Sequence, residues 1–306
     1  MTTLDAAQDS TPVGGGTGAT EAGHDAAILS EQVYRDGIAV VRDALPRSWA
    51  EQLDEDLSRE LGLALRTPGG VAARGWNRFY FEPYAERLRG FVELASHPVV
   101  GAVAEQMLGP DWRIVELGTD IPLPGAQDQP WHRDFPMPDA TRNEGRLTSI
   151  AVNATAVDVV DGPFQGVLGT HLDDSADLEG GMFPPDSQQG HFEARMQSFH
   201  ARMGNFSIRS GLMLHRGSAM STAARMRQVA ILGITSPDDR AIVLREKDPA
   251  DPTPPRIRMS RAYAESLDDA LRSRLSLEIV AETADELPPY RTEHSFEGLK
   301  MDQRKS

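Results

Sequence analysis

Three histidines in this chain are followed, two residues later, by an acidic residue: His132-Arg133-Asp134, His171-Leu172-Asp173 and His191-Phe192-Glu193. On an extended segment the side chains at positions i and i+2 point to the same side, so each pair could hold one metal ion. With 8 histidines and 46 acidic residues among 306, about one such pair is expected by chance. The spacing alone is therefore a weak signal, and the surrounding sequence must decide among the three pairs.

A further histidine ligand would have to come from a later strand that returns to the same end of the sheet. His215 follows the apolar run Leu212–Leu214, which predicts a strand, and precedes Arg216-Gly217-Ser218, which predicts a turn. The chain between His132 and His215 has room for about five strands, and the other two histidines leave much less. Two histidines and one carboxylate on one face of iron(II) leave positions open for a co-substrate and O₂. We therefore predict His132, Asp134 and His215 as iron ligands and as the catalytic centre.

The composition narrows the possible chemistry and partners. The absence of cysteine excludes disulfides, zinc–thiolate sites, iron–sulfur clusters and thiol nucleophiles. The net charge of −15 argues against nucleic acid or an anionic membrane surface as a partner. The sequence lacks an apolar run of the roughly 18 residues that a membrane span needs and lacks the pattern of a secretory signal. We therefore expect a cytoplasmic protein that acts on a small molecule; its oligomeric state is left open.

A co-substrate such as 2-oxoglutarate needs a cation for the carboxylate that does not bind iron. Arginine suits this role because its planar guanidinium binds a carboxylate through two parallel hydrogen bonds. Arg225 and Arg227 both follow His215. Arg227 closely precedes the apolar strand Val229–Leu232, so it could point into one end of a barrel.

Helices are predicted before the candidate site. Residues 1–26 are rich in Thr, Ala, Gly and Asp and are expected to be disordered, and residues 27–306 are expected to form one domain. Ser30 looks like a helix cap, Gly37–Val41 like a buried strand, and Pro46 like the start of a second helix. More helices are expected across residues 85–108, where Pro98 begins a helix that Gly109 ends.

From Trp112 to about residue 236 the pattern changes to short apolar runs separated by turn residues. The runs predict strands at Ile150–Val152, Val157–Val160, Gly166–Leu168, Phe206–Ile208, Leu212–Leu214 and Val229–Leu232. Residues 172–200 predict a long loop, in which Met182, Phe183 and Phe192 either line a lid or dock on the core. One helix is expected from Ala262 to about Leu275. The fold class is therefore mainly β with flanking helices, with its core at about 112–236.

The sequence resembles the phytanoyl-CoA dioxygenase-like family of iron(II)- and 2-oxoglutarate-dependent oxygenases. The matching segments span roughly residues 30–236 and include Trp131-His132-Arg133-Asp134, Gly162-Pro163, Gly169-Thr170-His171, Gly204-Asn205-Phe206, His215-Arg216-Gly217 and Arg227. The resemblance implies a double-stranded β-helix (a cupin-like jelly roll) with iron at one mouth. It also implies a dioxygenase that uses Fe(II), 2-oxoglutarate and O₂, releases succinate and CO₂, and oxidises a small organic molecule. Because Asp134 is present, hydroxylation, or desaturation or ring formation by the same kind of oxidation, is favoured over halogenation.

Two departures from the family pattern leave alternatives open. The family's arginine falls between Arg225 and Arg227, and counting back from Gly233 favours Arg227. A serine that contacts 2-oxoglutarate in relatives is replaced here by Gly217, so Ser218 is the candidate contact. The resemblance explains His171 as part of a structural turn. Two further residues stay ambiguous: Arg78 either reaches the active site or makes a surface ion pair, and Trp131 is expected to pack rather than recognise substrate.

Two rival functions remain. A cupin-like metalloenzyme would share the barrel but would not consume 2-oxoglutarate. A non-catalytic binding protein on the same barrel would not need iron. The breadth of the family and the composition suggest specialised-metabolite biosynthesis as the setting, and no residue pattern names the substrate.

Overall fold

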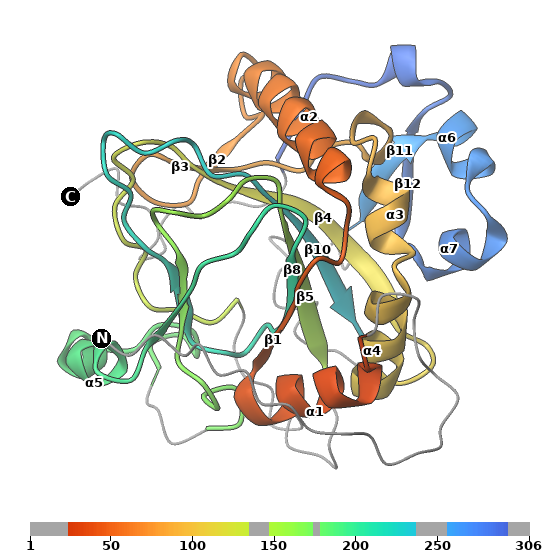
Figure 1. The fold of residues 1–306 in the computed structure, drawn as a ribbon. Coiled ribbons are helices and arrows are strands. Elements are labelled where there is room, and N and C mark those ends of the chain that lie inside the picture. Colours follow the sequence, from red (N-terminus) through yellow and green to blue (C-terminus); the bar gives the residue numbers. More distant parts are fainter. Residues whose placement is uncertain (1–23, 135–146, 174–177, 237–255, 293–306) are drawn as a thin grey trace.

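The centre of the protein is a pair of antiparallel β-sheets, seen in a computed structural model that describes residues 24–134, 147–173, 178–236 and 256–292 (Figure 1). The larger sheet has the order β1-β8-β5-β10-β4-β3-β2. Its strands are β1 (Ile38–Val41), β2 (Ala72–Ala73), β3 (Arg78–Tyr80), β4 (Arg113–Pro122), β5 (Ser149–Thr155), β8 (Phe206–Ser210) and β10 (Val229–Thr235). The smaller sheet, ordered β7-β6-β9, consists of β6 (Phe164–Gly166), β7 (Gln197–Phe199) and β9 (His215–Gly217). This is a jelly-roll core, and the predicted fold class is confirmed.

The outer face of the larger sheet carries the main hydrophobic core. Alternate residues of β5 and β10, such as Val152, Leu232 and Ile234, are completely buried there. They belong to one cluster with residues of the helices α1 (Ala26–Asp36), α2 (Arg47–Leu65), α3 (Phe91–Ala95) and α4 (Pro98–Leu108). Burial of this apolar surface is the main force that fixes the sheet against the helices.

The inner face of the same sheet is turned toward the smaller sheet. Asn153 of β5 is paired with Ile231 of β10 on one side and with Ser207 of β8 on the other, so the three share one level of the sheet. All three line a cavity between the two sheets. The period-2 alternation of the strands therefore separates an apolar outer face from a more polar, hollow inner face.

The helix predictions hold with corrections at the boundaries. Ser30 is not a cap, because α1 begins at Ala26 and the Asp25 side chain accepts hydrogen bonds from the first-turn backbone amides. Gly37 ends α1 with φ +88°, and a Cβ there would lie 2.8 Å from the His171 ring, so this position favours glycine. Pro98 begins α4 as predicted. The expected disorder of the first residues lies, up to residue 23, outside the described residues.

Two predicted strands are wrong. Leu212–Leu214 is buried but forms a turn, in which the Ser210 hydroxyl accepts a hydrogen bond from the Leu212 amide. The strand begins instead at His215, where a turn had been predicted. Val157–Val160 bends away from the sheet, and Val160 is 84% exposed. Periodicity cannot distinguish a short apolar strand from a buried turn, which explains both errors. The run predicted at Gly166–Leu168 is also shifted, because β6 ends at Gly166.

The remaining segments surround the sheets. Residues 178–200 are not a plain loop, since they contain η2 (Asp186–Gln188), α5 (Gln189–Glu193) and β7. The single helix expected in the tail is two helices, α6 (Arg261–Ser266) and α7 (Asp269–Arg274), because Asp268 caps a new helix. The parallel strands β11 (Ile257–Ser260) and β12 (Leu277–Ala281) flank them, and η1 (Ala85–Arg87) and η4 (Ala284–Glu286) complete the elements. Among the described helices, none is both long and apolar enough to cross a membrane.

Candidate metal centre and co-substrate site

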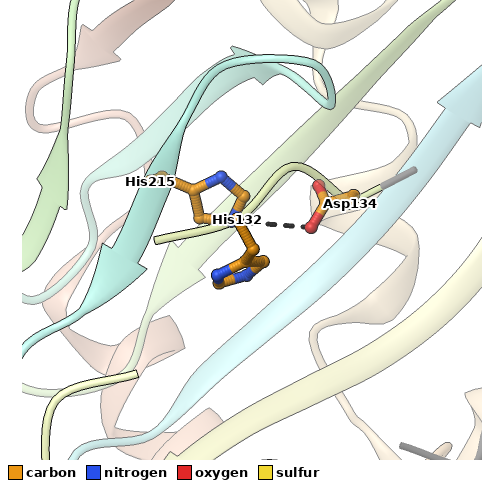
Figure 2. A group of neighbouring side chains, drawn as sticks. All are labelled: His132, Asp134 and His215. Atoms are coloured by element: carbon orange, nitrogen blue, oxygen red, sulfur yellow. Dashed lines mark ion pairs between the residues drawn. The ribbon is translucent and has the colours of Figure 1, made fainter. Parts of the chain in front are cut away.

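The three predicted metal ligands converge in the structure (Figure 2). His132 and His215 are paired backbone to backbone, each amide donating to the carbonyl of the other at 3.0 Å. Asp134 lies two residues after His132, and its backbone amide donates to the carbonyl of Gly211. Its carboxylate lies beside the His215 ring. One ligand atom from each of the three side chains lies within 4.8 Å of the others. Among the described residues, no other group of three His, Cys, Asp or Glu side chains comes this close.

The imidazole rings are oriented by backbone carbonyls. Nδ1 of His132 lies 2.8 Å from the carbonyl oxygen of Pro130, and Nδ1 of His215 lies 2.8 Å from that of Met213. A carbonyl oxygen only accepts, so each Nδ1 carries the proton and each Nε2 carries a lone pair. Nε2 of His132 is buried and has no hydrogen-bond partner among the residues that the structure describes, and Nε2 of His215 lies 3.5 Å from Oδ1 of Asp134. An orphaned lone pair beside a carboxylate fits a divalent metal ion.

The protonation states suit metal binding. Burial, followed by the charge of the neighbouring residues, lowers the pKa of both His132 and His215. Burial alone would raise the pKa of the Asp134 carboxyl, but Arg209 and His215 hold that pKa well below its usual range. Metal ligands must be deprotonated, so near neutral pH all three side chains are already in the binding form.

A cavity of about 240 Å³ adjoins the triad between the two sheets. His132 and His215 form part of its wall, together with Arg209 of β8 and Arg227, which lies just before β10. Aromatic side chains from the smaller sheet, Phe164 and Phe199, close the opposite side. The cavity therefore brings the candidate metal ligands and the candidate co-substrate anchor to one space.

The structure separates the two candidate anchors. Arg227 is 5% exposed and lines the cavity, with Nη1 donating to the Gly162 carbonyl and Nη2 lying 2.6 Å from Oδ2 of Asp120. Arg225 is exposed and forms an ion pair with Asp54 of α2. Of these two arginines, Arg227 is the one in a position to meet a ligand of the cavity, and its role as the anchor of 2-oxoglutarate stays a prediction.

Arg78 and Arg227 share one partner, the carboxylate oxygen Oδ2 of Asp120. It is fully buried, with Nη1 2.9 Å from Oδ2 of Asp120 and Nη2 donating to the carbonyl of Ser218. Burial lowers the pKa of Arg78 to about 10, so it stays charged near neutral pH. Burial opposes ionisation of Asp120, but Arg78 and Arg227 bring the pKa of Asp120 to about 2. The surface ion pair considered for Arg78 is therefore wrong, because this cluster of two arginines and one carboxylate is internal.

Ser218 is less well placed than the sequence suggested. Its hydroxyl donates to the carbonyl oxygen of Pro163 at 2.7 Å, and Gly217 rather than Ser218 is part of the cavity wall. The contact of Ser218 with 2-oxoglutarate stays a prediction.

The other two His-x-acid pairs are not part of the candidate metal centre. Nε2 of His171 lies 2.7 Å from the carbonyl oxygen of Tyr34, which ties the turn to α1. His191 lies on the exposed α5. Trp131 is completely buried and packs with Phe192, as expected for a structural residue. Met182, Phe183 and Phe192 are not part of the cavity wall, to which the same segment contributes Ser198, Phe199 and His200 instead.

Sequence reasoning missed several residues of the cavity wall, among them Arg209, Arg74, Asp120 and Gln129. Nη2 of Arg74 lies 3.6 Å from Oδ1 of Asp134. Arg209 donates to Oδ2 of Asp134 at 2.6 Å. Gln129 accepts from the Gly217 amide and donates to the Arg74 carbonyl, so it fastens β9 to the β2–β3 region. The available signal was the alternation of polar residues within otherwise apolar strands, as in Ser207 and Arg209 of β8.

The family match agrees with this geometry. Residues 33–229, more than half of the chain, match the family model described as phytanoyl-CoA dioxygenase (PhyH). The chain belongs to this family. It is a non-haem iron, 2-oxoglutarate-dependent enzyme, as predicted from the motifs. None of the curated proteins searched matched the chain.

Solved structures of similar fold include enzymes from antibiotic biosynthesis. The carbocyclase SnoK from nogalamycin biosynthesis has a TM-score of 0.56 and 14% identity, covering 72% of this chain and 87% of that one. The epimerase SnoN, in complex with Fe³⁺, alpha ketoglutarate and nogalamycin RO, has a TM-score of 0.53 and 18% identity, covering 69% and 83%. HygX from Streptomyces hygroscopicus, with nickel and 2-oxoglutarate bound, has a TM-score of 0.51 and 13% identity, covering 69% and 87%. At such identities the likeness supports the fold.

Proposed function

We propose that this enzyme hydroxylates a small organic molecule and that its iron(II) is held by His132, Asp134 and His215. The observation that carries the proposal is the convergence of these ligand atoms within 4.8 Å beside the cavity. The donor set is two imidazoles and one carboxylate, which suits iron(II) and leaves positions open for further ligands. The orphaned Nε2 of His132 supports the same reading.

The chain's own residues would bind and orient the reactants. When bound, iron(II) supplies the redox chemistry that couples decarboxylation of 2-oxoglutarate to oxidation of a C–H bond. Arg227 binds the distal carboxylate of 2-oxoglutarate, and Asp120 with Gly162 fixes the plane of its guanidinium. Phe164, stacked on His215 at 5.3 Å between ring centroids, shields the metal side of the cavity from water.

The substrate class and setting rest on analogy. The similar structures act in nogalamycin biosynthesis, and HygX comes from a Streptomyces species, so specialised metabolism is the proposed setting. Hydroxylation, rather than halogenation, is proposed from the presence of Asp134, and product analysis separates it from desaturation and ring formation. A cytoplasmic location stays a prediction.

The proposal is tested by 2-oxoglutarate-dependent release of succinate in the presence of iron(II), ascorbate and a panel of small molecules, with products identified by mass spectrometry. A hydroxylated product formed with equimolar succinate is expected. Loss of iron binding in Asp134→Ala, with normal binding in the matched control Asp173→Asn, would assign the carboxylate ligand. Oxidation of a substrate without consumption of 2-oxoglutarate would favour the cupin-like alternative, and failure of the wild type to bind iron would favour a binding protein.

A further inference from the structure

Arg209 is a buried cation that the proposed function does not use. It lies on the inner face of β8, lines the cavity, and has only 5% of its side chain exposed. Its Nη1 donates to Oδ2 of Asp134 at 2.6 Å and makes a longer contact with the Ser210 carbonyl. Within the part of the chain that the structure describes, neither Nε nor Nη2 has an acceptor, and Nε is buried. A buried donor without an acceptor is costly unless a ligand supplies one.

The free donors lie on one edge of the guanidinium group. The Nε–H and Nη2–H bonds of arginine are parallel, and this fork matches the two oxygens of a carboxylate. Nη1, on the other side of the group, is already occupied by Asp134. The ring of Phe164 lies 5.7 Å from the guanidinium carbon and also covers His215, so the fork is beside the metal ligands in a partly dry space.

The charges of the site favour an anion at this fork. A divalent ion bound by Asp134 and the two histidines would leave a positive excess beside Arg209. The carboxylate that lines the cavity within the described residues is Asp120, and it is bonded to Arg78 and Arg227. The balancing negative charge beside Arg209 must therefore come from a ligand.

Arg209 and Arg227, two of the four arginines that line the cavity within the described residues, start from distant backbone positions. Arg209 is paired with Ala151, which is paired with Gly233, whereas Arg227 lies six residues earlier than Gly233. Along strands that rise about 3.3 Å per residue, the two backbone positions are separated by roughly 20 Å. Both side chains line the same cavity, and arginines that reach one cavity from separate backbone positions suit a short dicarboxylate.

We propose that Arg209 is a second 2-oxoglutarate-binding residue, which binds the keto-acid carboxylate at the metal centre while Arg227 binds the distal carboxylate. This inference rests on the proposed function. It gives Arg209 two contacts at once, one to the ligand Asp134 and one to the co-substrate, so that the metal and 2-oxoglutarate are held in a fixed mutual orientation.

Calorimetric titration of the cobalt(II)-loaded protein with 2-oxoglutarate provides the first test. Arg209→Gln removes the charge and the fork, and the dissociation constant of 2-oxoglutarate should rise roughly 10- to 100-fold, the value of a charge-assisted hydrogen bond. Arg209→Lys should recover part of this loss. Binding of cobalt(II) alone should not weaken in Arg209→Gln, because the change removes a cation from beside a cation, and it should stay unchanged in Arg209→Lys, which keeps the charge. Arg225→Gln, a matched change at an exposed arginine, should bind both as the wild type does.

A shorter keto acid separates the roles of the two arginines. 2-Oxobutyrate has the keto-acid carboxylate but lacks the distal one. Arg209→Gln should weaken its binding to the cobalt(II) protein, and Arg227→Ala should leave that binding unchanged. Wild-type affinity for 2-oxoglutarate in Arg209→Gln overturns the proposal, and so does loss of cobalt(II) in that variant, which would make Arg209 a positioning residue for Asp134. Failure of the wild type to bind 2-oxoglutarate would instead reject the proposed function.

Discussion

The two faces of the seven-stranded sheet have different roles: one face packs in the hydrophobic core, and the other lines the cavity. In β5 the outward residues Ile150 and Val152 pack against the helices, whereas the inward residues Asn153 and Thr155 face the cavity. Alternate residues of such a strand therefore have different roles: those on one face stabilise the fold, and those on the other face can contact a ligand. Substitutions can therefore change one property with little effect on the other.

The comparison extends to unsatisfied polar groups. Several buried polar atoms of the cavity wall lack a hydrogen-bond partner within the described part of the chain, among them Nε2 of His132, Oδ1 of Asn153, and Nε of Arg209 and Arg227. Each such group costs about 1–3 kcal/mol when unpaired. Ligands that satisfy them should stabilise the fold through the inner face, since they add interactions that the unfolded chain lacks.

The largest expected effect is the loss of iron binding when a candidate metal ligand on the cavity wall is removed. His132→Ala and His215→Ala should each abolish iron binding and turnover while the fold survives, because neither side chain belongs to the hydrophobic core. Metal content after anaerobic loading, together with circular dichroism, measures both properties. His191→Ala, on the exposed α5, is the control and should behave as the wild type. Full activity in either triad variant would reject the ligand assignment.

The next effect concerns the co-substrate end of the cavity. Arg227→Ala removes a buried, charge-assisted contact and should cost about 2–5 kcal/mol of 2-oxoglutarate binding, or roughly 30-fold to several-thousand-fold in affinity. Iron affinity should change little. The apparent KM for 2-oxoglutarate measures the loss, and Arg225→Ala is the control because that side chain is exposed. A large effect in Arg225→Ala alone would show that the anchor has been misassigned.

Two isoleucines on β10 allow the contribution of each face of the sheet to stability to be compared. Ile234 is completely buried in the core of the outer face, whereas Ile231 lines the cavity. Ile234→Val should lower the free energy of unfolding by about 0.5–1.5 kcal/mol. Ile231→Val should cost less, because its lost methylene opens into existing space. Urea unfolding monitored by circular dichroism compares them, and an equal or larger loss in Ile231→Val would contradict the separation of the faces.

The smallest expected effect is the pH dependence of the metal-free protein. Burial lowers the pKa of His171 below its usual 6.5, so as the pH falls below that value the unfolded chain takes up a proton that the folded chain does not. The free energy of unfolding should therefore decrease as the pH falls below 6.5. Urea unfolding above and below this pH should show a weaker dependence in His171→Gln, and an unchanged slope would exclude this contribution.

Much of the fold was accessible from the sequence because its signals were local. Pro98 at the start of α4, Gly109 at its end and the apolar run in β10 were each recognisable from neighbouring residues alone. The errors arose where apolar residues are buried without being in a strand, as in Leu212–Leu214. Burial in a turn leaves the same sequence pattern as burial in a sheet.

The convergence of His132, Asp134 and His215 was predictable because their spacing along the chain restricts it, even though the strand next to His215 was misplaced. Arg209 and Asp120 were not, since nothing near either residue in the sequence marks it as part of the site. Their roles depend on which strands are neighbours and on the register between them, and β8 lies beside β5 although residues 156–205 separate the two strands in the chain. Pairing of that kind is decided by tertiary packing.

An anaerobic titration with iron(II) followed by 2-oxoglutarate tests the central claim most directly. The wild type should bind iron(II) stoichiometrically, and addition of 2-oxoglutarate should then produce the visible absorption of an iron(II)–keto-acid chelate. His132→Ala should show neither event, and Arg227→Ala should show the first but need far more 2-oxoglutarate for the second. Iron binding that survives loss of His132, or 2-oxoglutarate binding that does not depend on the metal, would contradict the account.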